Sequence, residues 1–324
     1  MYLLLRRLKT ALPSRGMRAA RLLLGACVLV AAGCGRDEPT PEATDSTAAV
    51  PLVPATALLA SVDSLPRNPL TAALPRDPVL AAQIRRGLQL MQETAAHAPT
   101  FVGNGMTCAN CHLNAGQRDG ALPLVGIAGL FPQFRPRDGR LITLEDRIRA
   151  CFLRSMDGSA PPYDSPEVLA LSAYITWISE GQPVGEDPPW RGRNRIPDAA
   201  LLPIERLDPA RGQQLYAQYC VACHGADGQG VDLGVVKPGP LWGPESWNDG
   251  AGAARVYTLA GFIRHAMPLT DPGMLTDEEA QHVAAYINAQ PRPAYAAKDE
   301  DYPGGAIPVD AVYDTRRYPQ HPLR

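Results

Sequence analysis

Apolar residues recur at helical spacing in four stretches of the chain, and these stretches form two matched pairs. The first pair is PVLAAQIRRGLQLMQET at 78–94 with EVLALSAYITWIS at 167–179, and the second is PARGQQLYAQYC at 209–220 with AQHVAAYINAQ at 280–290. Asp-Pro precedes the early stretch of each pair, which indicates a helix start because Asp caps a helix and Pro suits its first position. We therefore predict an all-α chain.

The late helix of each pair has its own start signal. Ser165 precedes the first of them, and Thr276 begins a capping box before the second. Both helices contain Ala-Tyr-Ile, and their tyrosines, Tyr174 and Tyr286, each lie 62 residues after the histidine of a C-x-x-C-H sequence. Equal spacing at matching positions predicts an internal duplication.

The two C-x-x-C-H sequences account for four of the seven cysteines. They are Cys108-Ala-Asn-Cys111-His112 and Cys220-Val-Ala-Cys223-His224. Two thiols one helical turn apart can add to the two vinyl groups of one haem, and the adjacent histidine then faces the iron. A disulfide, a thioredoxin-type pair or a zinc site are the alternatives for a single copy. Two copies in an exported chain predict two covalently bound haem c groups.

A helix, a haem motif, a loop-rich middle and a closing helix resemble a class I cytochrome c domain. The resemblance implies two tandem domains, each folded round one haem that fills most of its core. It also fits the modest aromatic content of 6%. The expected organisation is a signal peptide at 1–34, a Pro/Ala/Thr-rich tether at 35–75, domains at 76–184 and 204–295, a strap at 185–203 and an irregular C-terminal tail at 296–324.

The N-terminus predicts export. Six of the 31 Lys and Arg lie in the first 21 residues. They precede the apolar run LLLGACVLVAA at 22–32, which is too short to span a bilayer and typical of a signal peptide. Gly33-Cys34 then resembles a bacterial lipoprotein cleavage site, so we expect Cys34 to carry the membrane anchor in the periplasm. Ordinary cleavage with Cys34 as a bystander is the alternative. The remaining chain has 25 basic against 33 acidic residues, which argues against nucleic-acid binding.

Each haem iron has a sixth position. In the second half, Met267 precedes Pro268 in GFIRHAMPL and is the expected ligand, because a methionine thioether opposite histidine is common in c-type cytochromes. Met274 and His265 are its rivals, and His265 would give a bis-histidine haem.

Two residues compete for the sixth position in the first half. Met156 lies 18 residues before Tyr174, much as Met267 lies 19 before Tyr286, which favours Met156 and leaves Cys151 as a buried thiol. Thr143 and Asp146, however, predict a capped helix from 144 to about 155. That helix places Arg147, Cys151 and Ser155 on one face with Arg154 beside them, and arginines favour a thiolate, which can ligate haem iron.

Three stretches are similar to the dihaem cytochrome c thiosulfate dehydrogenases, which form tetrathionate. They are TCANCHLNAG, GLFPQFRPRDGRLITLEDRIRACFLRSMDG and LWGPESWNDGAGAARVYTLAGFIRHAMPL. The resemblance covers about 76 to 303. It implies that Cys151 is the axial thiolate of the first haem, that Met267 ligates the second, and that the substrate is bound by Arg137, Arg147, Arg154 and Ser155. Some members use a lysine near Met267, where this chain has His265 and Ala266.

Local charge fits an anionic substrate. Six arginines between 135 and 154 outnumber the three acidic residues there, in a chain that is otherwise net negative. Two dianions a few ångströms apart repel by several kcal/mol at an effective dielectric of ~20, and guanidinium groups offset this repulsion. Half of these arginines are expected to be surface charges or haem-propionate partners.

The expected electron acceptor is a soluble periplasmic cytochrome c or similar protein. The alternatives are a dihaem electron carrier without a substrate and a haem subunit of a sulfur-transferring thiosulfate-oxidising complex.

Overall fold

The computed structural model describes residues 72–234 and 238–311, which belong to one compact unit. The predicted signal peptide, Cys34, most of the tether and the last 13 residues lie outside the described residues. None of the helices in the described ranges is long and apolar enough to cross a membrane.

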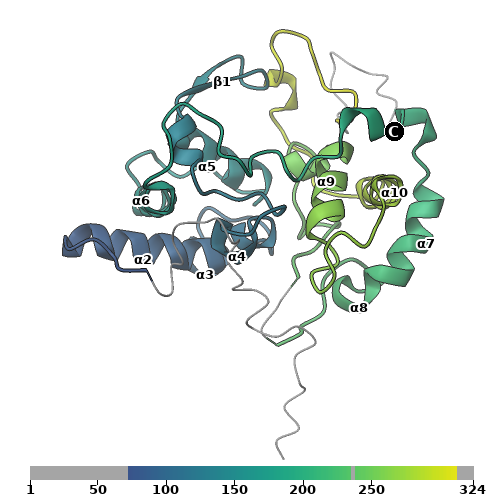
Figure 1. The fold of residues 1–324 in the computed structure, drawn as a ribbon, viewed down its shortest axis with the longest axis horizontal. Helices are drawn as coiled ribbons and strands as arrows, with labels where there is room; N and C mark the ends of the chain where they lie inside the picture. The colour runs from purple at the N-terminus through teal and green to yellow at the C-terminus, as the bar shows by residue number, and fades with distance from the viewer. Residues whose placement is uncertain (1–71, 235–237, 312–324) are drawn as a thin grey trace, which may run out of the picture. The chain divides into compact units, whose positions relative to one another are not determined.

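The N-terminal half, residues 72–184, is built round a crossed pair of helices. Helix α2 (Pro78–Gln92) lies beneath α6 (Pro166–Ser179), which is seen end-on in Figure 1. Its shorter elements are α3 (Thr94–His97), α4 (Leu113–Gly116), α5 (Leu144–Arg154) and the 3-10 turns η1 (Cys108–Asn110) and η2 (Ile127–Leu130). Asp77 and Ser165 cap α2 and α6 through their side-chain oxygens, as the sequence predicts.

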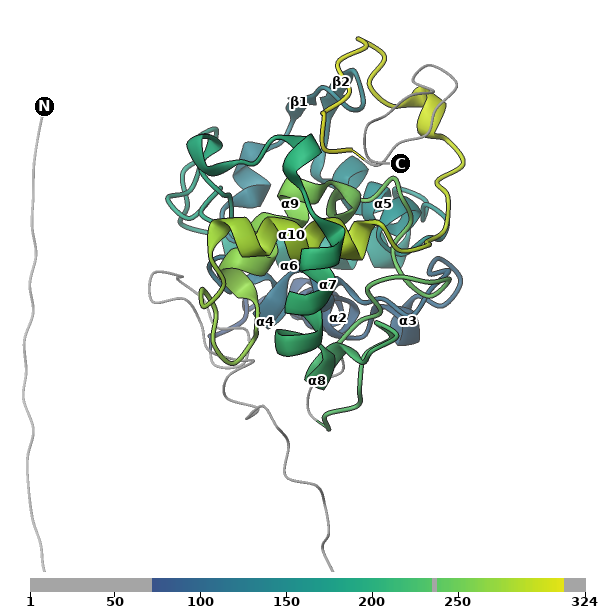
Figure 2. The same ribbon diagram turned by 90° about the vertical axis from the view of Figure 1, so that its right-hand side faces the viewer.

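The C-terminal half, residues 204–295, repeats this arrangement. Figure 2 shows α10 (Asp277–Asn288) crossing α7 (Pro209–Tyr219). The half also contains α8 (Val221–His224), α9 (Val256–Ala266) and the 3-10 turns η4 (Ile204–Arg206) and η5 (Gly252–Ala254); η3 (Asp198–Ala200) lies in the strap and η6 (Lys298–Glu300) in the C-terminal segment. The predicted capping box from Thr276 to Glu279 is confirmed.

A glycine sits at both helix crossings. A Cβ on Gly87 of α2 would lie 2.2 Å from the Ala170 carbonyl oxygen and 2.5 Å from the Cβ of Tyr174. A Cβ on Gly212 of α7 would lie 2.0 Å from the His282 carbonyl oxygen and 2.9 Å from the Cβ of Tyr286. The two Ala-Tyr-Ile sequences therefore mark equivalent crossings, at which only glycine lets the backbones approach so closely.

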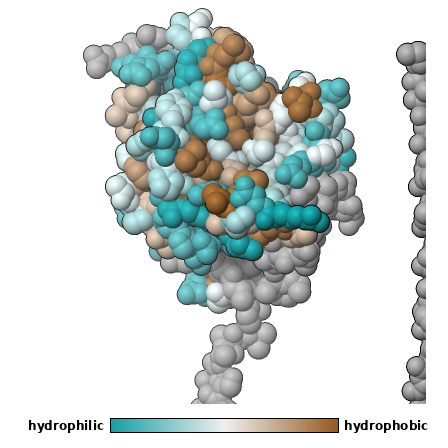
Figure 3. Space-filling model, turned by 90° about the vertical axis from the view of Figure 1, so that its left-hand side faces the viewer, coloured by the Kyte–Doolittle hydropathy of each residue, from teal (hydrophilic) through white to brown (hydrophobic). Residues whose placement is uncertain are grey.

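The chain also forms one small sheet, which the all-α prediction omitted. Strands β1 (Gln133–Arg135) and β2 (Arg140–Ile142) pair antiparallel, with Gln133 opposite Ile142. Gly139, at φ +63°, closes the turn. The cross-strand partners Phe134 and Leu141 stay 60% and 62% exposed. Figure 3 shows apolar patches among polar surface on one side of the molecule. Three-residue strands are too short to give a reliable alternating pattern in sequence.

The two halves share one apolar core and are further joined by the C-terminal segment, residues 296–311. Buried residues of both halves, among them Leu171 and Leu215, belong to a single cluster. Asp301 pairs with Arg154 of the first half, and Asp310 pairs with Arg255 of the second. Apart from the 3-10 turn η6, this segment is irregular, and it contacts both halves.

Replacing Gly212 by Ala tests the crossing of α7 and α10. We expect a loss of about 1–3 kcal/mol in the free energy of unfolding, since the added methyl overlaps a backbone carbonyl that cannot move alone. Gly252→Ala is the control, because a Cβ at Gly252 meets nothing within 4 Å. Denaturant unfolding of the holoprotein measures both, and equal stability of the two variants would contradict the assignment.

Candidate functional site

A cavity of about 560 Å³ lies beside the first C-x-x-C-H sequence. One part of its wall is apolar and comes from the N-terminal half, from Met91, Leu124, Ile127, Phe131, Leu144, Ile148, Phe152, Met156, Leu171 and Ile175. Another part is polar and contains Arg135, Arg147, Arg191, Asn194, Arg195, Asp198, Arg255, Tyr257 and Thr258. A flat apolar group with charged substituents on one edge matches such a lining.

His112 is oriented for binding a metal through its other nitrogen. Its Nδ1 lies 2.6 Å from the Leu122 carbonyl oxygen, which accepts the Nδ1 proton and leaves the Nε2 lone pair available. Burial lowers the pKa of His112 to about 4, and Arg147 adds to that effect while the Leu122 carbonyl opposes it. The imidazole is therefore neutral at physiological pH, as a metal ligand must be.

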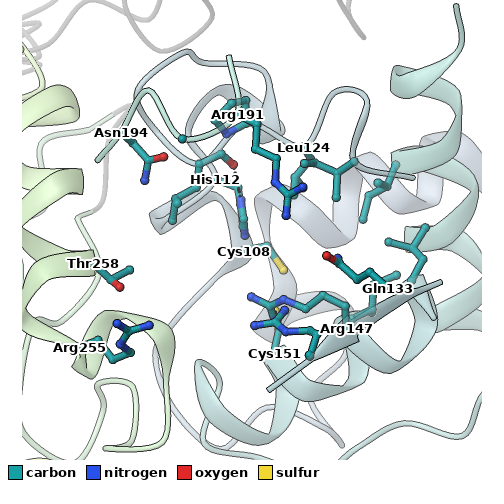
Figure 4. A pocket seen from close by; sticks show the side chains of 18 of the residues that line it. Cys108, His112, Leu124, Gln133, Arg147, Cys151, Arg191, Asn194, Arg255 and Thr258 are labelled. Carbon is teal, nitrogen blue, oxygen red and sulfur yellow. Dashed lines mark hydrogen bonds between the residues drawn. The ribbon is translucent and has the colours of Figure 1, made fainter. Parts of the chain in front are cut away.

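Cys108 and Cys151 line this cavity, and Cys111 lies one turn after Cys108. Burial raises the pKa of Cys108 to about 12, and that of Cys111 likewise to about 12, with the charge of Cys151 adding to both. Cys108, Cys111 and Cys151 all carry free thiols. In Figure 4, Cys108 lies between His112 on one side and Cys151 with Arg147 on the other. A group bonded to Cys108 would thus sit between an imidazole and a thiol.

Helix α5 carries the thiol of Cys151 into the cavity. The predicted capping box at its start is confirmed, because the Thr143 side chain accepts from the Asp146 N–H and the Asp146 carboxylate accepts from the Thr143 N–H. Arg147 lies one turn before Cys151, and its Nη1 donates to Cys151 Sγ over 2.9 Å. This hydrogen bond holds the guanidinium against the sulfur on the side of α5 that lines the cavity.

Met156 and Cys151 both line the cavity, but they differ in exposure. Met156 is only 3% exposed and packs within the apolar core cluster, whereas Cys151 is half-buried. The sulfur of Cys151 is therefore the more accessible of the two to a group in the cavity.

The structure separates the predicted substrate residues into two sets. Arg147 lines the cavity, whereas Arg137, Arg154 and Ser155 do not belong to its lining. Arg154 pairs with Asp301 at 2.6 Å, and Arg137 donates to the Gly250 carbonyl oxygen over 2.7 Å. These partners hold the two guanidiniums against the C-terminal half and its following segment.

The other arginines of this stretch also have assigned places. Arg135 lines the cavity, where burial and the neighbouring Arg147 lower its pKa to about 10. Arg140 pairs with Asp146 at 3.0 Å, and Arg149 stacks on the Tyr163 ring at 3.8 Å. Arg135 and Arg147 are thus the two arginines of the stretch that are placed to meet an anion in the cavity.

Sequence reasoning missed the contribution of distant segments to the cavity. Arg191, Asn194 and Arg195 come from the strap, and Arg255 with Thr258 come from the start of α9 (Figure 4). The arginine-rich sequence WRGRNR in the strap was the available signal. It does not reveal which haem it would face, because that depends on how the two halves pack.

The second C-x-x-C-H sequence forms the turn α8. Burial lowers the pKa of His224 to about 4, and the Gly239 carbonyl partly offsets this effect. Burial also raises the pKa of Cys220 to about 12, and the thiols of Cys220 and Cys223 are free. Tyr216, Trp242 and Tyr286 pack on one another with ring centroids 5.3 to 5.8 Å apart and supply an aromatic wall nearby.

The candidate sixth ligands of the second half occupy different environments. Met267, directly after α9, packs partly buried against Leu113 and Ala121 of the first half. The Nε2 of His265 is buried without a hydrogen-bond partner, whereas Met274 is 43% exposed. Exposure argues against Met274 as a ligand.

Both sites fit a covalent haem c. The first offers an apolar cavity, a histidine with its Nε2 available and two thiols at the required spacing, and the second offers a buried neutral histidine after paired thiols.

Two family models match the chain. Residues 94–184 match a model described as the SoxA/TsdA cytochrome c domain, and residues 207–287 match one described as cytochrome c oxidase, cbb3-type, subunit III. The two matched ranges contain one C-x-x-C-H sequence each. The chain therefore has two cytochrome c domains, and with them two covalently bound haem c groups.

Curated relatives and a solved structure extend the match over both domains. The thiosulfate dehydrogenase of Allochromatium vinosum is 44% identical over 252 residues, 74% of this chain and 91% of that protein. That of Stutzerimonas stutzeri is 41% identical over 212 residues, 65% of this chain and 67% of that protein. The structure of thiosulfate dehydrogenase (TsdBA) from Marichromatium purpuratum is similar at 41% identity and a TM-score of 0.64, over 71% of this chain and 49% of that one. On this similarity, together with its two haem attachment sites, the chain belongs to the thiosulfate dehydrogenase family.

Proposed function

We propose that this protein oxidises thiosulfate to tetrathionate at the first haem site and passes the electrons through the second haem to an external acceptor. The observation that carries the proposal is the placement of Cys151: its sulfur accepts a hydrogen bond from Arg147 and shares a cavity with His112. An electron-transfer cytochrome that binds no substrate does not require a cysteine and an arginine in contact beside its haem.

The reaction joins two thiosulfate dianions through their outer sulfurs into one tetrathionate dianion and releases two electrons. When bound, the two haems accept these electrons one at a time. Arg147 and Arg135 supply the positive charge that holds the sulfonate oxygens and offsets the repulsion between the two anions. Arg135 is half-buried, so water screens its charge only in part.

We propose that Cys151 and His112, which line the same cavity, would hold the iron of the first haem. A cysteine ligand would lower the reduction potential of that haem relative to a thioether ligand. Met267 is proposed as the ligand of the second haem opposite His224, which gives that haem the higher potential. Electrons then pass downhill from the substrate haem to the exit haem.

The chain brings the two attachment segments close together. A Cβ on Gly239, which follows the second attachment sequence, would lie 2.8 Å from the side chain of Asn110, between Cys108 and Cys111. Close packing of this kind supports direct electron transfer between the haems within one molecule.

The apolar run at 22–32 and its preceding basic residues support export to the periplasm. We propose that the protein is exported, held at the membrane by a lipid on Cys34, and oxidised by a soluble cytochrome c or a similar acceptor. The competing function, a haem subunit that transfers sulfur to a carrier protein, would need a partner for turnover.

Replacing Cys151 by Ala tests the proposed ligand. Both haems should stay covalently bound, because Cys108, Cys111, Cys220 and Cys223 are unchanged. Anaerobic haem reduction by thiosulfate should slow by about two orders of magnitude, as expected for loss of a group at the reacting atoms. Reduction by dithionite is the control and should stay complete. Full thiosulfate-dependent reduction in this variant would remove Cys151 from the mechanism.

Arg147→Gln tests the anion site against a neighbour on the same helix. We expect KM for thiosulfate to rise about tenfold to hundredfold, since a hydrogen bond to a charged group contributes about 1.5–3 kcal/mol. Arg149→Gln is the matched control, because Arg149 donates to the Pro161 carbonyl oxygen outside the cavity. Steady-state assays at two ionic strengths measure both variants. Equal KM values would contradict the role of Arg147.

Met267→Ala tests the second haem. The variant should lose the charge-transfer band of a methionine-ligated ferric haem, while Met274→Ala, at an exposed methionine, should keep it. Persistence of the band in Met267→Ala would exclude Met267. Loss of a histidine signature in His265→Ala would assign the ligand to His265.

A further inference from the structure

The C-terminal end of α5 is capped by the second domain. The last carbonyls of a helix lack partners within it. Here the side-chain amide of Asn248 donates to the Leu153 carbonyl oxygen over 2.9 Å, and the backbone N–H of Asn248 donates to the Arg154 carbonyl oxygen over 3.1 Å. Both carbonyls lie within one turn of Cys151, so a residue of the second domain holds the helix that carries the thiol.

Both polar atoms of the Asn248 side chain are hydrogen-bonded. Its side chain is 1% exposed, and its Nδ2 also donates to Asp157 Oδ1 over 2.8 Å. Its Oδ1 accepts from the Gly250 N–H over 3.1 Å. The three side-chain hydrogen bonds fix the amide orientation, which makes Asn248 a rigid contact between the domains.

Two further contacts hold the same end of α5. The side-chain amide of Asn104 donates to the Ser155 carbonyl oxygen over 3.0 Å and to the Ser246 carbonyl oxygen over 2.9 Å. Arg154, 9% exposed, donates both terminal nitrogens to Asp301 and stacks on the Tyr295 ring at 4.1 Å. The end of α5 is thus held by residues on either side of the interface between the domains.

We propose that Asn248 is a positioning residue for the first haem: by capping α5 from the second domain, it sets where the Cys151 sulfur stands. This inference rests on the proposed role of Cys151 as ligand. A displacement of about 1 Å at a ligand or reacting group is enough to lower activity greatly, and supporting hydrogen bonds exist to prevent it. The second domain is therefore part of the first haem's ligand geometry as well as an electron exit.

The same account explains why Arg154 and Ser155 belong to the specific stretch around Cys151 without lining the cavity. Arg154 holds the helix end through its side chain, and Ser155 does so through its carbonyl oxygen. Both act on Cys151 through the backbone of α5.

Asn248→Asp is the direct test, because it keeps the shape of the side chain but replaces the amide donor with a carboxylate oxygen. That oxygen would face the Leu153 carbonyl oxygen and Asp157 Oδ1, to which the amide donates. We expect the fraction of first haem with thiolate ligation, measured by electron paramagnetic resonance of the ferric holoprotein, to fall by at least half. The midpoint potential of the first haem should shift while that of the second stays constant. The kcat for thiosulfate should fall about tenfold.

Asn288→Asp is the matched control. Asn288 is also a buried asparagine of the second domain, and its amide donates to the Ala253 carbonyl oxygen over 3.1 Å, away from α5. It should lower stability without altering the thiolate signal. If Asn248→Asp does not yield folded dihaem protein, Asn248→Ser removes the amide without adding charge and gives the same comparison.

An unchanged thiolate signal and an unchanged first-haem potential in a folded Asn248 variant overturn the positioning role. A wild-type spectrum without thiolate ligation overturns the proposed function, and the positioning role with it. A thiolate signal that is present in the wild type, lost in Cys151→Ala and weakened in Asn248→Asp but not in Asn288→Asp supports both.

Discussion

The hydrogen bond from Arg147 to Cys151, 2.9 Å long, is the contact on which the site depends. It joins a guanidinium and a sulfur that line the same cavity as His112. Both residues stand on α5 four positions apart, so a single turn of helix fixes their separation. The capping box of Thr143 and Asp146 fixes where that helix begins, and hence the direction in which the pair points.

Contacts from other parts of the chain fix the position of α5 and of the histidine across the cavity from it. On the opposite side of the cavity, the Leu122 carbonyl orients His112. At the far end of α5, Asn248 and Asp301 hold the helix from the second domain and the C-terminal segment. A dihaem chain that only relayed electrons would need the haems to be close, but it would not need one domain to cap the helix of the other that carries Cys151.

Much of the architecture could be predicted from the sequence because it depends on local signals. Asp-Pro helix starts, capping boxes and the C-x-x-C-H spacing each act over a few residues, and the duplication was visible in the equal spacing of Tyr174 and Tyr286. The close crossings at Gly87 and Gly212 were not predicted, since the sequence around a helical glycine does not identify the helix that packs against it. The same limit explains the arginines: Arg137 and Arg154 lie beside the cavity residues in sequence, but their partners, Gly250 and Asp301, are more than 100 residues away.

The most direct test of the account is electron paramagnetic resonance of the ferric wild-type protein before and after anaerobic addition of thiosulfate. The account predicts two low-spin ferric haems, one of them with a thiolate ligand. Both signals should disappear on addition of thiosulfate, with one electron transferred for each thiosulfate consumed and tetrathionate as the product. Two methionine-ligated haems that stay oxidised in the presence of thiosulfate would contradict it.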